Sequence, residues 1–108
     1  MIYEVMLTAN AEDDLDQFVK YLLYVKKNMQ AARSLLEDFE ETKSSLGLVA
    51  HSLAYCLDPR LKEQGYRRIN FRFHRYFMLY RIENDTVIVD GIFHELQDFE
   101  NMMRQGKI

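Results

Sequence analysis

His94 and two arginines supply side chains that suit proton transfer beside a phosphate group. The imidazole of a histidine titrates near neutral pH, so His94 can both accept and donate a proton under cellular conditions. The guanidinium groups of Arg68 and Arg75 are able to bind phosphate oxygens in pairs and to stabilise negative charge that develops during a reaction. These three residues are therefore candidates for catalysis. The alternative for the two arginines is that they pair with acidic residues of a helix or of a partner protein.

A second set of side chains is predicted to contact a substrate or a target: Arg67, Arg72, Tyr80, Arg81 and Asp98. Each has a structural alternative. Arg81 either contacts a phosphate or pairs with Glu83, and the tyrosines Tyr66, Tyr76 and Tyr80 either stack on bases or pack in the core. His94 has one as well, because at a strand end it can hydrogen-bond Asp90 or Asp98.

Positive charge is concentrated in one part of an acidic chain. The net charge is −3, yet residues 60–81 carry +6 and the remainder carries −9. Fields act through local patches as well as through totals, so a basic face is compatible with the acidic average. We expect the arginines of successive strands to converge on one concave patch beside His94.

The composition indicates one globular domain, residues 1–108, with 48% hydrophobic side chains to form its core. The single cysteine, Cys56, excludes an internal disulfide and fits a reducing compartment. The segment "MIYEVMLTANAEDD" lacks the features of a signal peptide, and no apolar run approaches the roughly 20 residues that cross a bilayer. We expect a cytoplasmic protein without membrane contact.

The first half of the chain is predicted to form a strand and an antiparallel helical hairpin. Residues 2–7 favour a strand, Thr8 or Asn10 can cap the helix that follows, and Asn28 marks the turn before a second helix that ends at Gly47. The run "EDFEET" is interpreted as a solvated face. Apolar side chains recur at helical spacing: Ala11, Leu15, Phe18, Val19, Leu22 and Val25, then Ala32, Leu35, Leu36, Phe39 and Leu46.

The second half is predicted to form an antiparallel three-strand meander and a short C-terminal helix, "ELQDFENMMRQ". Residues 47–65 show no sustained period and are interpreted as a loop that can include a turn of helix or a short strand. The next strand has a buried face made of alternating side chains: Ile69, Phe71 and Phe73. "YFMLYRI" is typical of a central strand, "END" of a turn, and "TVIVDGIFH" of a last strand with Asp90 and His94 on one face. These elements define an α+β fold with the helical hairpin on one face of the sheet.

The order of these motifs resembles the RelE/ParE superfamily of toxins from bacterial type II toxin–antitoxin systems. The opening "AEDDLDQFVKYL" after a strand ending in "LT", the central "YFMLYRI" and the closing "IFHELQD" carry the similarity. The resemblance implies the α+β fold already predicted, no cofactor and no metal. It also implies a cognate antitoxin protein as partner, in a toxin–antitoxin hetero-oligomer.

The resemblance implies growth inhibition by one of two mechanisms. Some members cut mRNA on the ribosome, a metal-independent endoribonuclease activity that would use His94, Arg68 and Arg75, and others poison DNA gyrase. Where the ribonucleases carry an arginine in the central strand, this chain has Phe77. This departure weakens the enzyme interpretation and leaves a third alternative, a non-toxic binding or regulatory module without catalytic activity.

Overall fold

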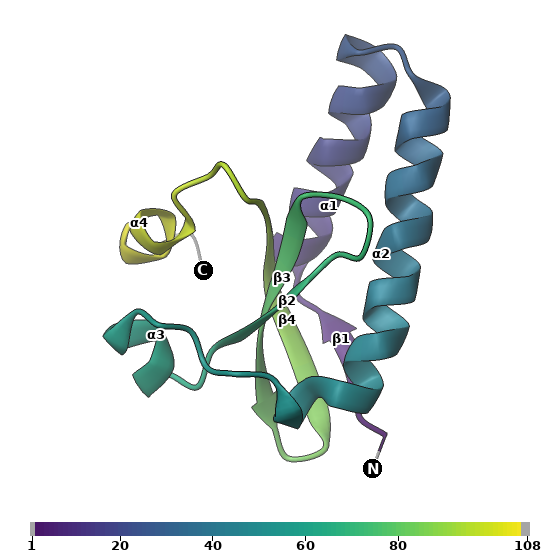
Figure 1. Cartoon of the computed structure of the whole chain (residues 1–108). Coiled ribbons are helices and arrows are strands. Elements are labelled where there is room, and N and C mark those ends of the chain that lie inside the picture. The colour runs from purple at the N-terminus through teal and green to yellow at the C-terminus, as the bar shows by residue number, and fades with distance from the viewer. Residues whose placement is uncertain (1, 107–108) are drawn as a thin grey trace.

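The computed structural model describes residues 2–106 and consists of a four-stranded sheet with helices on both faces (Figure 1). The elements follow in the order β1 (Glu4–Leu7), α1 (Ala9–Lys20), α2 (Met29–Val49), α3 (Pro59–Glu63), β2 (Arg67–Asn70), β3 (Tyr76–Glu83), β4 (Thr86–His94) and α4 (Phe99–Arg104). The strand order is β1-β4-β3-β2, in which β1 runs parallel to β4 and the other pairs are antiparallel. The predicted α+β fold is confirmed.

The helical hairpin begins and turns where the sequence predicts. The Thr8 side chain accepts a hydrogen bond from Ala11 N–H at the start of α1, and Asn28 accepts one from Ala31 N–H at the start of α2. Two positions assigned to the buried faces are wrong, because Val25 is exposed at the turn and Leu36 lies at the border of the buried stripe.

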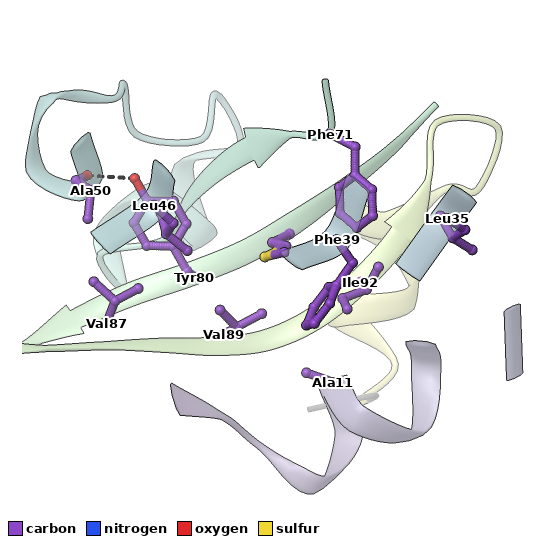
Figure 2. Close-up of a cluster of buried hydrophobic side chains, with 11 residues drawn as sticks. Ala11, Leu35, Phe39, Leu46, Ala50, Phe71, Tyr80, Val87, Val89 and Ile92 are labelled. Atoms are coloured by element: carbon purple, nitrogen blue, oxygen red, sulfur yellow. Dashed lines mark hydrogen bonds between the residues drawn. The ribbon is translucent and has the colours of Figure 1, made fainter. Parts of the chain in front are cut away.

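The main core lies between the hairpin and one face of the sheet (Figure 2). Its buried members come from both helices, the two central strands, the residue after α2 and the loop after β2: Ala11, Leu35, Phe39, Leu46, Ala50, Phe71, Met78, Tyr80, Val87, Val89 and Ile92. The Tyr80 hydroxyl donates to the Ala50 carbonyl at 2.5 Å, which satisfies the one polar atom of a fully buried side chain. We call this face of the sheet the hairpin face.

A second, smaller core covers the opposite face of the sheet, which we call the C-terminal face. Phe77, Leu79 and Phe93 point to this side and pack with Cys56, Leu61 and Tyr66, while Phe99, Met102 and Met103 of α4 cover them. Residues 47–65 thus hold the short helix α3, which agrees with the turn of helix that the sequence analysis allowed within this loop. Asp58 caps it and Pro59 occupies its first turn, where a missing N–H costs nothing.

The strand predicted to run through Phe73 ends at Asn70. Residues 71–75 form a loop, and Phe73 is exposed instead of buried. The buried carboxylate of Asp38, on α2, holds this loop by accepting from Arg72 N–H (3.1 Å), Phe73 N–H (2.9 Å) and His74 Nδ1 (2.7 Å). The prediction of a solvated "EDFEET" face is therefore wrong at Asp38, which is 2% exposed.

A β-bulge in β4 changes which side chains share a face. Leu79 pairs with Gly91 while Tyr80 pairs with Val89, so Asp90 is an extra residue on β4. The two-residue alternation fails there, and Asp90 and His94 point to opposite faces, contrary to the prediction. Beyond the end of β1, the side chain of Asp14 on α1 accepts a hydrogen bond from Ile92 N–H at 3.0 Å. This backbone N–H of β4 therefore has a hydrogen-bond partner although β1 has ended.

The register of α2 can be tested with two neighbouring leucines. Leu35 is fully buried and Leu36 is 40% exposed, so Leu35→Ala leaves a cavity and Leu36→Ala does not. We expect Leu35→Ala to lower the free energy of unfolding by about 2–5 kcal/mol and Leu36→Ala by less than about 1 kcal/mol, measured by denaturant titration. Equal losses would contradict the packing of α2.

Candidate functional site

The arginines predicted to act together lie on different sides of the sheet. Arg68 pairs with Leu79 across β2 and β3, and like Leu79 it points to the C-terminal face. Its guanidinium lies 3.6 Å from the ring centroid of Phe77 and 5.7 Å from that of Phe99. It also donates to Asn70 Oδ1, from Nη2 at 3.0 Å. The contact with the Phe77 ring holds this cation at the edge of the second core.

The other arginines of this region do not lie beside Arg68 on the C-terminal face. Arg67 donates from Nη1 to the carbonyls of His51 (2.9 Å) and Leu53 (2.6 Å), which fastens the segment after α2 to the sheet edge. Arg72 and Arg75 lie exposed in the loop between β2 and β3. Arg72 does not share a strand face with Arg68, because β2 ends before it.

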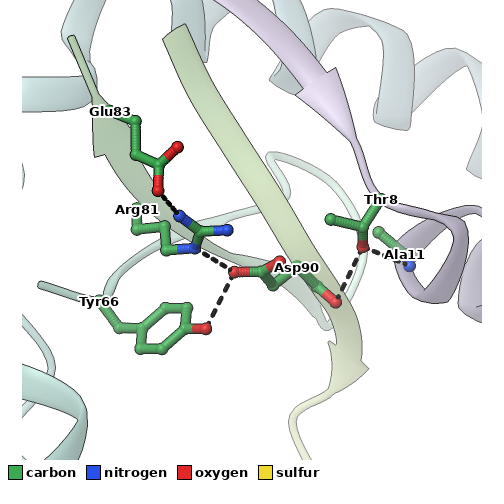
Figure 3. A network of polar contacts seen from close by, with 6 residues as sticks. All are labelled: Thr8, Ala11, Tyr66, Arg81, Glu83 and Asp90. Atoms are coloured by element: carbon green, nitrogen blue, oxygen red, sulfur yellow. Dashed lines mark hydrogen bonds and ion pairs between the residues drawn. The ribbon is translucent and has the colours of Figure 1, made fainter. Parts of the chain in front are cut away.

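A buried carboxylate holds Arg81 on the C-terminal face (Figure 3). Asp90 Oδ2 accepts from Arg81 Nε at 2.8 Å and from the Tyr66 hydroxyl at 2.9 Å, and Arg81 Nη1 also pairs with Glu83. Of the two alternatives for Arg81, the structure shows the pair with Glu83. The structure also shows an ion pair that was not predicted, between Arg81 and Asp90, whose side chain is 3% exposed. The bulge provides this contact, because it turns Asp90 toward Arg81.

His94 lies at the end of β4 on the hairpin face. Its Nδ1 accepts from Leu96 N–H at 3.1 Å, so the neutral ring carries its proton on Nε2. The ring meets Tyr76 edge-on at 4.9 Å, and Tyr76 in turn meets Phe18 of α1 at 4.7 Å. The Asp98 carboxylate caps α4 instead, by accepting from Asn101 N–H at 3.3 Å.

The predicted convergence on one concave patch is wrong. Arg68 and His94 lie on strands that flank β3, with partners three residues apart along it, and their side chains point to opposite faces. Their backbones are separated by roughly 10 Å along the strands and by about 10 Å across them. The catalytic roles of His94, Arg68 and Arg75 stay a prediction, but in this arrangement the first two do not reach one reacting atom.

Two further side chains are buried and contact other parts of the chain itself. Tyr80 is 0% exposed, so as folded it does not reach a target, and Tyr66 is buried on the other face.

Burial raises the pKa of the Cys56 thiol, which keeps it protonated and unreactive. Within residues 2–106, no group of three His, Cys, Asp or Glu side chains is placed to bind a metal ion, and no helix has the length and apolarity to cross a membrane.

A surface that the sequence interpretation passed over lies at the turn of the hairpin. Figure 1 shows α1 and α2 extending past the end of the sheet, with the turn far from the other strands and helices. Four large apolar or aromatic side chains are exposed there: Tyr21, Tyr24, Val25 and Met29. We call residues 20–33 the hairpin tip. The signal in the sequence was the run "YLLYVKKNM", which places lysines directly after aromatic and aliphatic residues.

Comparison with known proteins agrees with the fold. A family profile described as the ParE toxin of the type II toxin–antitoxin system parDE matches residues 5–99. The solved chromosomal ParDE TA system from P. aeruginosa contains a chain with 19% identity and a TM-score of 0.68, over 86% of this chain and 96% of that chain. A toxin–antitoxin complex, RelBE2 from Mycobacterium tuberculosis, gives 21% identity and a TM-score of 0.59, over 87% and 99%. No curated protein sequence matches.

The family profile matches nearly the whole chain, and this match establishes the family to which the protein belongs. This chain belongs to the ParE toxins of type II toxin–antitoxin systems, within the RelE/ParE superfamily that the sequence motifs resemble. The two solved structures are below 25% identity, so they show that the fold is shared and nothing finer.

The contact between Arg81 and Asp90 predicts a loss of stability on neutralising the buried carboxylate. Asp90→Asn removes the charge that pairs with Arg81 and weakens two hydrogen bonds at once. We expect the free energy of unfolding to fall by about 1–3 kcal/mol in denaturant titration. The control Glu83→Gln changes the 60% exposed partner of Arg81 and is expected to cost less than about 1 kcal/mol. A larger loss in the control would contradict the network.

Alkaline pH gives a second test of this network. Burial, and then the hydrogen bond to Asp90, raise the pKa of Tyr66 from 10.0 to about 12. Between these two values the unfolded chain has lost a proton that the folded chain keeps, so the free energy of unfolding falls as pH rises. We expect Tyr66→Phe to show a shallower fall than the wild type in urea titrations across this window. An identical slope would contradict the shifted pKa.

Proposed function

We propose that this protein is a toxin that poisons DNA gyrase and is neutralised by a cognate antitoxin. The separation of His94 and Arg68 on opposite faces of the sheet carries the choice between the two mechanisms. Metal-independent RNA cleavage needs a proton-transfer group and a cation within hydrogen-bond reach of one phosphate. Gyrase poisoning requires only a surface that binds the enzyme at the step where DNA is cut.

The charge and the burial of the predicted site support the same choice. The chain is acidic, with net charge −3, whereas binding to ribosomal RNA profits from broad positive charge. Phe77 stands where the ribonuclease members carry an arginine, and it is 1% exposed in the second core. A cation at that position would be buried under α4, so the C-terminal face of this chain is organised around aromatic packing.

The antitoxin is expected to cover exposed apolar surface on the resting toxin. Leu57 and Leu96 are 97% and 83% exposed, and Phe73 is 67% exposed in the loop held by Asp38. Exposed side chains of this kind are typical of protein–protein contacts, and a flexible partner that orders on binding is able to reach several of them. We propose that the toxin and its antitoxin form a hetero-oligomer, and that the toxin acts without a cofactor or a metal ion.

Induced expression in bacteria separates the mechanisms. We expect DNA synthesis to stop before protein synthesis, measured by incorporation of labelled thymidine and methionine. Purified toxin is expected to inhibit supercoiling by purified gyrase and to trap cleaved DNA. Co-expression of the neighbouring reading frame is expected to restore growth.

Two controls make the test decisive. His94→Ala and Arg68→Ala are expected to retain inhibition of gyrase in the supercoiling assay, because neither residue is assigned to the contact with gyrase. Early arrest of protein synthesis, with mRNA cuts that both variants abolish, would overturn the proposal in favour of the ribonuclease. Absence of any growth defect would favour the non-toxic binding module.

A further inference from the structure

The hairpin tip combines exposed apolar side chains with a cluster of positive charge. Tyr24, Val25 and Met29 are 71%, 65% and 66% exposed, although large apolar side chains normally avoid water. Lys20, Lys26, Lys27 and Arg33 carry +4, and the sequence has no acidic residue between Gln17 and Leu36. The remainder of the chain carries −7, so the net charge of the tip has the opposite sign to that of the rest of the molecule.

The cations of the tip are largely free of internal partners. Lys20 pairs with Asp16 at 2.9 Å. Among the described residues, no carboxylate lies within ion-pair distance of Lys26, Lys27 or Arg33. The Lys26 ammonium lies 5.7 Å from the ring centroid of Tyr21. These charges are therefore available to an external anionic surface.

The backbone of the tip departs from regular helix. Over Tyr21–Val25 the helix widens into a π-helical turn, with Lys26 N–H donating to the Tyr21 carbonyl at 3.0 Å. Lys27 has φ of +51°, which costs a residue other than glycine about 1 kcal/mol. Two antiparallel helices can be joined without a π-helical turn and without a positive φ. Such departures from regular backbone geometry are common at binding sites.

We propose that the hairpin tip is the surface that docks into an acidic, apolar-lined pocket of the target protein. This inference rests on the proposed function, in which the target is a gyrase subunit. The lysines would direct the approach by charge, and Tyr24, Val25 and Met29 would bury their exposed area in the pocket. The core between the hairpin and the sheet supplies a rigid base for the two helices.

The composition of the tip favours a protein over the other anionic partners. DNA offers phosphates and stacked bases but little apolar surface for Val25 and Met29, which are aliphatic and exposed. A symmetric contact with a second copy would bring +4 against +4 across a twofold axis, which is repulsive. A protein pocket with acidic rim and apolar floor matches both the charge and the exposed side chains.

Two tip variants test the docking surface against purified gyrase. Tyr24→Ala removes an exposed aromatic ring, and the double variant Lys26→Glu with Lys27→Glu reverses the charge. We expect each to raise the toxin concentration that half-inhibits supercoiling by about tenfold or more. The charge variant is also expected to show a weaker dependence of gyrase affinity on salt, measured by biolayer interferometry with immobilised gyrase. The matched controls, Leu57→Ala and Lys62→Glu, alter exposed residues far from the tip.

The outcomes separate this inference from the proposed function. Inhibition by the wild type and by the controls, lost in both tip variants with an unchanged melting temperature, would support the docking surface. Wild-type potency in the tip variants would overturn it and leave gyrase poisoning intact. No inhibition by the wild type would overturn both. Equal loss of binding to a linear DNA duplex without gyrase would overturn the protein pocket in favour of a DNA contact.

Discussion

The extra residue at Asp90 in β4 governs how the functional side chains of this protein are distributed. It shifts the alternation of the strand by one position, so Asp90 turns to Arg81 and Tyr66 on the C-terminal face while His94 turns to Tyr76 on the hairpin face. A bulge in a strand buried on both faces is costly unless its polar groups are satisfied. Asp14, Thr8 and Arg81 supply partners around it. The same bulge therefore orders the core and separates the candidate catalytic residues.

Burial of the sheet on both faces explains why so many arginines serve the fold. Phe77, Leu79 and Phe93 need a cover, which α3 and α4 provide, and this cover occupies the face where an open cationic groove was expected. Arg68 then lies over the Phe77 ring, Arg67 holds two carbonyl groups and Arg81 neutralises a buried carboxylate. Three of the seven cations in residues 60–81 thus bind groups within the chain, whereas Arg72 and Arg75 lie exposed.

The proposed function requires surfaces for two partners, an antitoxin and a target, and we assign them to separate places on the molecule. Exposed leucines beside α3 and before α4 suit a partner that covers the sheet side of the molecule. The hairpin tip lies beyond the sheet and has the opposite charge from the rest of the chain. If the antitoxin and the target use these different surfaces, neutralisation would follow from blocking the approach to the target or from altering the hairpin, without direct competition for one site.

The sequence alone determined the elements whose causes are local. Caps at Thr8 and Asn28, the "END" turn and the doubly apolar "YFMLYRI" depend on neighbours in the chain and were predicted correctly. The helical spacing of apolar residues was also correct, except at Val25 and Leu36. The tertiary structure decided what depends on distant partners: the end of β2 at Asn70, where Asp38 of α2 holds the following loop, and the bulge at Asp90. It also decided that Arg68 and His94 do not meet, because a one-residue shift in a strand reverses the face of every side chain beyond it, and no local pattern in the sequence records such a shift.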